Sequence, residues 1–247
     1  DRRGLIQLDD LKRKISDQTV LISVSLANNE LGTIQPLSEI AELIHHVRQQ
    51  RLQHGVATPL YLHSDASQAA NLLNLNVARL GVDLLTLNAA KCGGPKGVGA
   101  LYVSRAVQSQ IQPITVGGGQ ERGLRSGTEN VPGVIGFAVA ISEAQAHCSS
   151  RLKQYQEMAS VLRRELAHTL IVSHKLEHVN SAIFLGDPKQ QLASFIPVCF
   201  PGIDAERLIY RLEAHDVFVS TGAACAANKG TKSHVLAAIG LTDTEIA

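Results

Sequence analysis

Two short apolar segments, each followed by polar residues, constrain the fold of this chain more than any other feature. Residues 61–64 lead into Asp65, and residues 82–87 lead into a stretch that ends at Lys91 and a glycine-rich run. Apolar runs of this length, bounded by polar residues and glycine, are typical of buried strands. We therefore expect Asp65 and Lys91 to lie just beyond the ends of two strands of one sheet.

The other predicted elements place these strands in an α/β fold. Further strands are predicted at 19–26 and 100–103, with a helix over 36–53 between the first two strands. Alternation of this kind predicts a mixed, mostly parallel sheet. From Val131 the pattern changes to a long helix over about 133–168, with a break near 148–151, and then to strands at 180–185 and 195–200 and a helix at 204–215. We expect a large α/β domain over residues 1–140 and a smaller α+β domain over residues 141–247.

Asp65 and Lys91 together indicate a particular cofactor. Open α/β sheets place their ligands at the carboxyl ends of strands. Pyridoxal phosphate (PLP) requires a lysine for its Schiff base and a buried carboxylate that keeps the ring nitrogen protonated. Alone, each half of the pair is weak, because Asp at a strand end is often a helix cap and lysine before glycine is often a turn residue. Their order and strand context favour the PLP interpretation.

Five motifs, spread along nearly the whole chain, support that interpretation. They occupy residues 27–32, 65–68, 91 with 94–102, 117–130 and 220–225. In this order, and with similar spacing, they resemble the class V aminotransferases and, within them, the cysteine desulfurase and selenocysteine lyase family. The resemblance implies a PLP-dependent transferase-like fold, with a large cofactor-binding domain and a small C-terminal domain, and a homodimer. Relative to the family, the chain is expected to be truncated at both ends.

The resemblance also implies roles for individual residues. Lys91 would hold the cofactor and carry protons, and Asp65 would pair with its ring nitrogen. Gln68 and Asn29 would lie near its phenolic oxygen, where neutral amide donors stabilise negative charge. Thr128 would reach the cofactor phosphate of the opposite subunit.

Cys225 distinguishes this family from ordinary transaminases. It lies in a run of small residues, and a thiolate there would take the sulfur of L-cysteine as a persulfide and leave L-alanine. A sulfur-acceptor protein would then receive the sulfur for iron-sulfur clusters or tRNA thiolation. Three alternatives stay open. The first is a selenocysteine lyase that acts on L-selenocysteine, and the second is a catalytically silent scaffold that presents the Cys225 loop to a partner. The third is a segment of a longer protein that folds poorly and has no activity alone.

Three residues around Lys91 depart from the family pattern. Where the family usually carries a serine and a histidine that help to bind phosphate, this chain has Asn88 and Ala90. Asn88 can still donate a hydrogen bond to phosphate and Ala90 cannot, so weaker cofactor binding is expected. Cys92, directly after the lysine, has no explanation from the sequence.

Composition argues against several other functions. The formal net charge is +1, with acidic and basic residues dispersed, so neither nucleic acid nor an anionic membrane is an expected partner. The four cysteines form no CxxC pair, so neither a metal site nor a disulfide framework is indicated. No apolar run reaches membrane-spanning length. The expected compartment is the cytoplasm.

Overall fold

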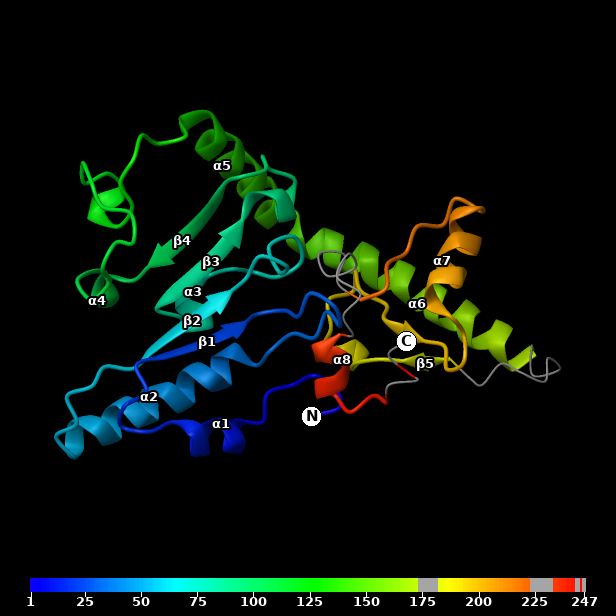
Figure 1. Ribbon diagram of the computed structural model, residues 1–247, viewed down its shortest axis with the longest axis horizontal. Coiled ribbons are helices and arrows are strands. Elements are labelled where there is room, and N and C mark those ends of the chain that lie inside the picture. The colour runs from blue at the N-terminus through cyan, green and yellow to red at the C-terminus, as the bar shows by residue number, and fades with distance from the viewer. Residues whose placement is uncertain (173–181, 223–232, 243–244, 246–247) are drawn as a thin grey trace. The chain divides into compact units, whose positions relative to one another are not determined.

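The computed structural model describes residues 1–172, 182–222, 233–242 and 245 of the chain (Figure 1). Contacts divide the chain into two compact units. We call residues 6–26 with 35–151 the sheet unit, and residues 1–5, 27–34 and 152–247 the terminal unit. The domain boundary predicted at residue 140 stays a prediction, as does the separate C-terminal domain.

The sheet unit is built on a four-stranded sheet in the order β1-β2-β3-β4. Strand β1 pairs in parallel with β2, β2 pairs in parallel with β3, and β4 closes the sheet as an antiparallel edge. The α/β class with a mixed, mostly parallel sheet is thereby confirmed. The strands are β1 (Leu21–Ser25), β2 (Tyr61–Asp65), β3 (Leu84–Asn88) and β4 (Gly99–Val103).

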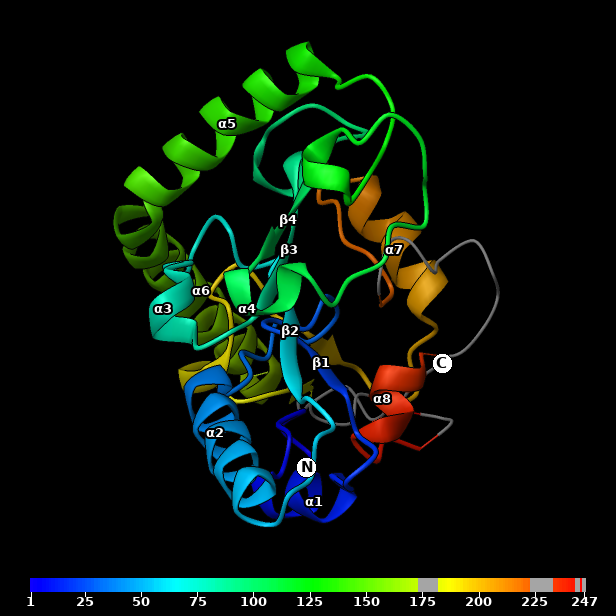
Figure 2. The same cartoon turned by 90° about the vertical axis from the view of Figure 1, so that its left-hand side faces the viewer.

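One face of this sheet is covered and the other is more open. In β1, Ile22 and Val24 are buried while Leu21, Ser23 and Ser25 are exposed. Helix α2 (Leu37–Gln53) lies along the covered face, as Figures 1 and 2 show, and buries its own apolar stripe of Leu37, Ile40 and Ile44. Successive side chains of a strand point to opposite faces, so residues 23, 63 and 65 share the open face. The shorter helices of this unit are α1 (Leu8–Lys14), α3 (Val77–Leu80) and α4 (Arg105–Gln108).

Helix α5 (Val131–Ala146) packs on the glycine-rich run through a face of small residues. A Cβ added to Gly136 would lie 2.7 Å from Pro95 Cγ, and one added to Gly94 would lie 3.2 Å from Ala140 Cβ. Such distances leave no room for larger side chains. The close packing of α5 therefore helps to determine the backbone conformation of residues 93–99.

The terminal unit contains two short antiparallel strands and several helices. The long helix expected over 133–168 is interrupted at His147, close to the predicted break, and continues as α6. Part of the strand predicted at 180–185 lies outside the described residues. The elements are α6 (Cys148–Val172), whose residues up to Arg151 are counted with the sheet unit, β5 (Ile183–Phe184), β6 (Val198–Cys199), α7 (Ala205–Glu213) and α8 (His234–Ala238).

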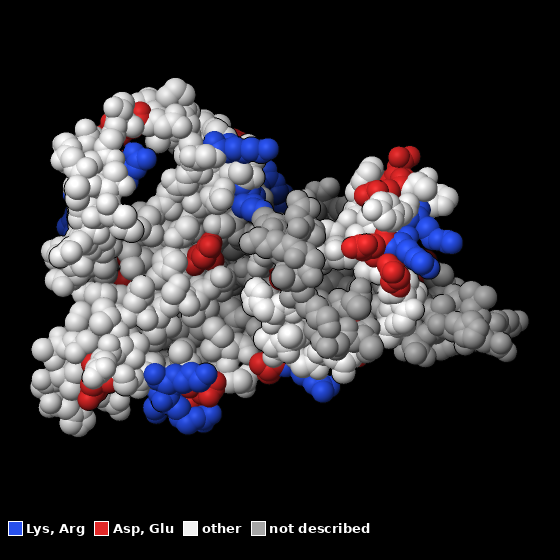
Figure 3. All heavy atoms as spheres, in the orientation of Figure 1, with Lys and Arg blue, Asp and Glu red and all other residues white. Residues whose placement is uncertain are grey.

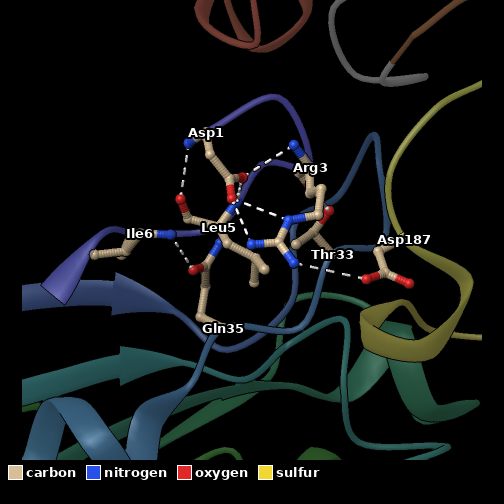
Figure 4. A network of polar contacts seen from close by, with 7 residues as sticks. All are labelled: Asp1, Arg3, Leu5, Ile6, Thr33, Gln35 and Asp187. Carbon is tan, nitrogen blue, oxygen red and sulfur yellow. Dashed lines mark hydrogen bonds and ion pairs between the residues drawn. The ribbon is translucent and has the colours of Figure 1, made fainter.

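Residues 27–34 are tied into the terminal unit by polar contacts (Figure 4). The Thr33 hydroxyl, which is fully buried, donates to the Arg3 carbonyl at 2.8 Å. Arg3 is paired with Asp1 at 2.8 Å and faces Asp187 at 3.8 Å. Exposed ion pairs contribute little to stability, so the buried hydroxyl is the more important of these contacts.

Arg51, near the end of α2, is a buried cation that holds together two loops of the sheet unit. Its side chain is 5% exposed, and its guanidinium donates to the carbonyls of Ser16, Thr19, Thr58 and Pro59. Loss of the guanidinium would leave these carbonyls without that donor.

We predict that Arg51→Met lowers the free energy of unfolding by about 3 kcal/mol, because hydrogen bonds from charged donors contribute more than neutral ones. Urea denaturation measures the change. The control is Gln49→Met, an exposed position of the same helix, where we expect a change of less than about 0.5 kcal/mol. Equal stability of the two variants would contradict the role given to Arg51.

Candidate active site

Asp65 is the last residue of β2, and its backbone is held on both sides by the sheet. Its carbonyl accepts from Leu26 N at 2.8 Å, and the next amide, Ala66 N, donates to Thr86 O at 2.9 Å. Carboxylate Oδ1 accepts from Ser67 N at 2.8 Å. In the described part of the chain no hydrogen bond is made to Oδ2. A fixed, half-buried carboxylate with one oxygen available can accept a hydrogen bond from a ligand.

Lys91 lies in η1 (Ala89–Cys92), a single 3-10 turn directly after β3. The Asn88 side-chain oxygen accepts from Ala90 N at 3.0 Å and caps the start of the turn. Gly93, with a φ of 83°, ends it in the left-handed conformation that glycine adopts without strain. The Lys91 side chain is exposed. The turn thus presents an amine at the carboxyl end of β3.

Cys92 now has a structural explanation. Its side chain is 8% exposed and packs in a cluster with Ala70, Ala89, Phe137 and Ala144. The thiol donates to the Ala89 carbonyl at 3.3 Å, and burial raises the pKa of Cys92 above its ordinary value. A protonated, buried thiol is a poor nucleophile. Cys92 therefore anchors the turn into the core while the neighbouring Lys91 faces outward.

The loop that follows β2 lies beside this turn. Gln68, in that loop, is half-buried. Asn71 Nδ2 donates to the Lys91 carbonyl at 2.7 Å, which brings the loop and the turn into contact. Because β2 and β3 are parallel neighbours, Asp65, Gln68 and Lys91 come from the same edge of the sheet. Asn71 was not among the residues predicted, and an asparagine in a loop gives no signal of such a role.

A histidine links three strands just below this edge. His63 Nδ1 is 2.8 Å from Ser23 Oγ on β1, and Nε2 is 2.8 Å from Thr86 Oγ1 on β3. Burial lowers the pKa of His63 below its ordinary value, and the nearby Asp65 carboxylate opposes that shift. Each ring nitrogen has a hydroxyl partner that can donate or accept, so the neutral ring is fully satisfied.

Thr128 belongs to the sheet unit and is exposed, after the short turn η2 (Glu121–Gly123). The preceding loop is folded on itself. Ser126, 6% exposed, donates its backbone N–H to Thr115 O at 3.1 Å, and Gly127 N donates to Gln120 Oε1 at 3.1 Å. These hydrogen bonds fix the loop that leads to Thr128. Contact of Thr128 with a phosphate stays a prediction.

The remaining predicted residues belong to the terminal unit. Asn29 is exposed, while the side chain of its neighbour Asn28 accepts from the backbone of Glu30 and Leu31, both at 2.8 Å. Asn28 thus shapes the turn and leaves Asn29 at its surface. Cys225 lies outside the described residues.

The sheet-unit residues fit PLP at its ring nitrogen and at the carbonyl that forms the Schiff base. Asp65 offers a carboxylate oxygen for the ring nitrogen, and Lys91 offers an exposed amine. At the phosphate the fit is weaker, because the Asn88 oxygen is used as a cap and only its amide hydrogens remain as donors. Ala90 supplies no side-chain donor.

Charged side chains of both signs lie on the described surface. Figure 3 shows basic and acidic side chains interspersed on one face of the molecule. Among the described residues, no group of three or more His, Cys, Asp or Glu side chains is placed to hold a metal ion. No helix in the described ranges is long and apolar enough to cross a membrane.

Comparison with known proteins shows the family of the chain. The family model "Aminotransferase class-V" matches residues 1–245, and the chain belongs to this family, whose members are PLP-dependent. The protein named Cysteine desulfurase IscS 1 of Archaeoglobus fulgidus is 38% identical over 245 residues, which cover 99% of this chain and 58% of that protein. The chain therefore spans little more than half the length of this curated relative.

Two solved structures extend the comparison. One, titled "NIFS-LIKE PROTEIN", has a TM-score of 0.79 at 31% identity. The match covers 100% of this chain and 58% of that protein chain. Another, "SspA in complex with cysteine", has a TM-score of 0.70 at 29% identity. The match covers 100% of this chain and 62% of that protein chain. Both support the PLP-dependent fold expected from the sequence.

The lowered pKa of His63 predicts a pH dependence of stability. The unfolded chain takes up a proton at His63 near pH 6.5, whereas the folded protein does so only at lower pH. The contribution of His63 is therefore fully present above about pH 6.5 and is lost as the pH falls through the folded pKa.

The test compares the wild-type protein with His63→Gln by urea denaturation from pH 7.5 down to pH 5. The stability advantage of the wild type should shrink over this range. The exposed His45→Gln serves as control, and its difference from the wild type should stay constant. A constant difference for His63→Gln as well would contradict the assignment.

Proposed function

We propose that the protein is a PLP-dependent cysteine desulfurase that converts L-cysteine to L-alanine and leaves the sulfur on Cys225. The observation that carries this proposal is the placement of Asp65 and Lys91 at the ends of adjacent parallel strands, each with a polar group available. The names of the similar proteins support the substrate, since one is a cysteine desulfurase and another was solved with cysteine.

Each residue of the site would have a distinct task. The cofactor, when bound, supplies an electron sink for the substrate α-carbon. Asp65 would keep the ring nitrogen protonated and so maintain that sink. Lys91 would hold the cofactor and then move a proton with its amine, and Gln68, Asn29, Asn88 and Thr128 would donate hydrogen bonds to the cofactor.

Cys225 would take the sulfur. Its thiolate forms a bond to the substrate sulfur while the bond from that sulfur to the β-carbon breaks, and the electron pair stays with the carbon. Protonation of the carbon gives alanine, and the enzyme retains a persulfide. Cysteine plus the enzyme thiol thus balance alanine plus the enzyme persulfide.

The proposed partners rest on this chemistry and on the resemblance to the family. A persulfide needs an acceptor, so we propose a sulfur-acceptor protein that serves iron-sulfur cluster assembly or tRNA thiolation. We also propose a homodimer, in which Thr128 reaches the phosphate of the other subunit, and a cytoplasmic location. L-selenocysteine is the alternative substrate.

Lys91 can be identified directly by trapping. We predict that borohydride reduction of the protein with PLP labels Lys91, as mapped by mass spectrometry, and that Lys91→Ala abolishes the absorbance band of bound cofactor. Lys96→Ala, a control in the same glycine-rich stretch and also exposed, should keep it. Label scattered over surface lysines would refute the site.

Cys225 can be separated from cofactor binding. We predict that Cys225→Ser binds PLP like the wild type but loses alanine formation from L-cysteine by at least about a hundredfold, since serine cannot carry the sulfur. Cys148→Ala, which removes a buried cysteine, is the control and should retain turnover. A protein that binds PLP but forms no alanine even as wild type would instead be the silent scaffold.

A further inference from the structure

Asn71 connects the loop after β2 to the turn that carries Lys91. Its side-chain amide donates to the Lys91 main-chain carbonyl at 2.7 Å. In a short helical turn the final carbonyls have no partner within the turn. Asn71 supplies one for Lys91, from a residue that is 20 positions away in the sequence.

The orientation of the Asn71 amide follows from its two neighbours. Arg151 Nη1 lies 3.4 Å from Asn71 Oδ1, and arginine can only donate. The Lys91 carbonyl can only accept. Both neighbours therefore require the same orientation, with the oxygen toward Arg151 and the amide hydrogens toward Lys91.

The loop that carries Asn71 is itself held in place by helix α5. Gln145 Nε2 donates to the carbonyls of Ala70 at 2.7 Å and Leu73 at 2.9 Å, and Gln145 Oε1 accepts from Leu75 N at 3.0 Å. All of these residues belong to the sheet unit. A loop fixed by three such hydrogen bonds can hold the Asn71 side chain steady against the turn.

We propose that Asn71 is a positioning residue for Lys91. It fixes the Lys91 backbone, and with it the direction in which the amine leaves the turn, and it does not touch the amine itself. The proposal rests on the proposed function only for the role of Lys91 in holding the cofactor. Gln145 and Arg151 support Asn71 in this role.

The test compares matched asparagine substitutions in one loop. Asn71→Asp keeps the size and the oxygen that faces Arg151 but removes the donor to Lys91, and Asn71→Ala removes the donor without adding charge. The controls are Asn74→Asp and Asn74→Ala, because Asn74 is exposed in the same loop and its side chain accepts only from Asn76 N among the described residues.

The first measurement uses cofactor-free protein and a small amine-reactive reagent. Mass spectrometry gives the labelling rate of Lys91 relative to that of Lys96, so each protein is its own reference. A general loosening of the fold raises both rates, whereas misplacement of Lys91 changes the ratio. We expect both Asn71 variants to change this ratio by about fivefold, the scale of one net hydrogen bond, and the Asn74 variants to leave it unchanged.

The second measurement is the rate of PLP release, which should rise by a similar factor in the Asn71 variants alone. Wild-type ratios and release rates in both Asn71 variants would overturn the proposal. If the wild type takes PLP at Lys91 but forms no alanine, the proposed function fails and the positioning role is still tested. If Lys91 takes no PLP, the ratio in cofactor-free protein still decides the role of Asn71.

Discussion

Parallel pairing of β1, β2 and β3 determines where the polar groups of the candidate site lie. Because the strands run in the same direction, their carboxyl ends meet at one edge, and Asp65 and Lys91 follow two neighbouring ends. Hydrogen bonds from both sides then fix the Asp65 backbone. An antiparallel arrangement of β2 and β3 would have separated the carboxylate from the amine by the length of a strand.

The turn that carries Lys91 is held in place by its neighbours, including two residues that depart from the family pattern. The Asn88 side-chain oxygen accepts from Ala90 N and caps the turn, and the Cys92 side chain is buried in the core. Asn71 adds a hydrogen bond to the Lys91 carbonyl. The turn is thus fixed at its start, its core side and its end, while its phosphate donors are few. We therefore expect the placement of the lysine and the strength of phosphate binding to vary independently in this chain.

Much of the sheet unit could be predicted because its signals are local. The strands and α2 lie within a few residues of their predicted positions, and the break near residue 148 appears at His147. The supporting contacts could not be predicted, because they join residues far apart in sequence. The role of Arg51 is the exception, because Arg51 lies on the same helix face as the buried Ile40 and Ile44. A charged side chain at such a position requires buried hydrogen-bond partners. Gln145 lies likewise one turn beyond Ile141, which packs against the core cluster.

The central claim is that PLP is held between Asp65 and Lys91 at the carboxyl edge of the sheet. The most direct test is a crystal structure of the protein grown with PLP. The account predicts a covalent bond from Lys91 Nζ to the cofactor and an Asp65 oxygen within about 2.7–3.2 Å of the ring nitrogen. A cofactor bound to another lysine, or a ring nitrogen that faces any group other than Asp65, would contradict it.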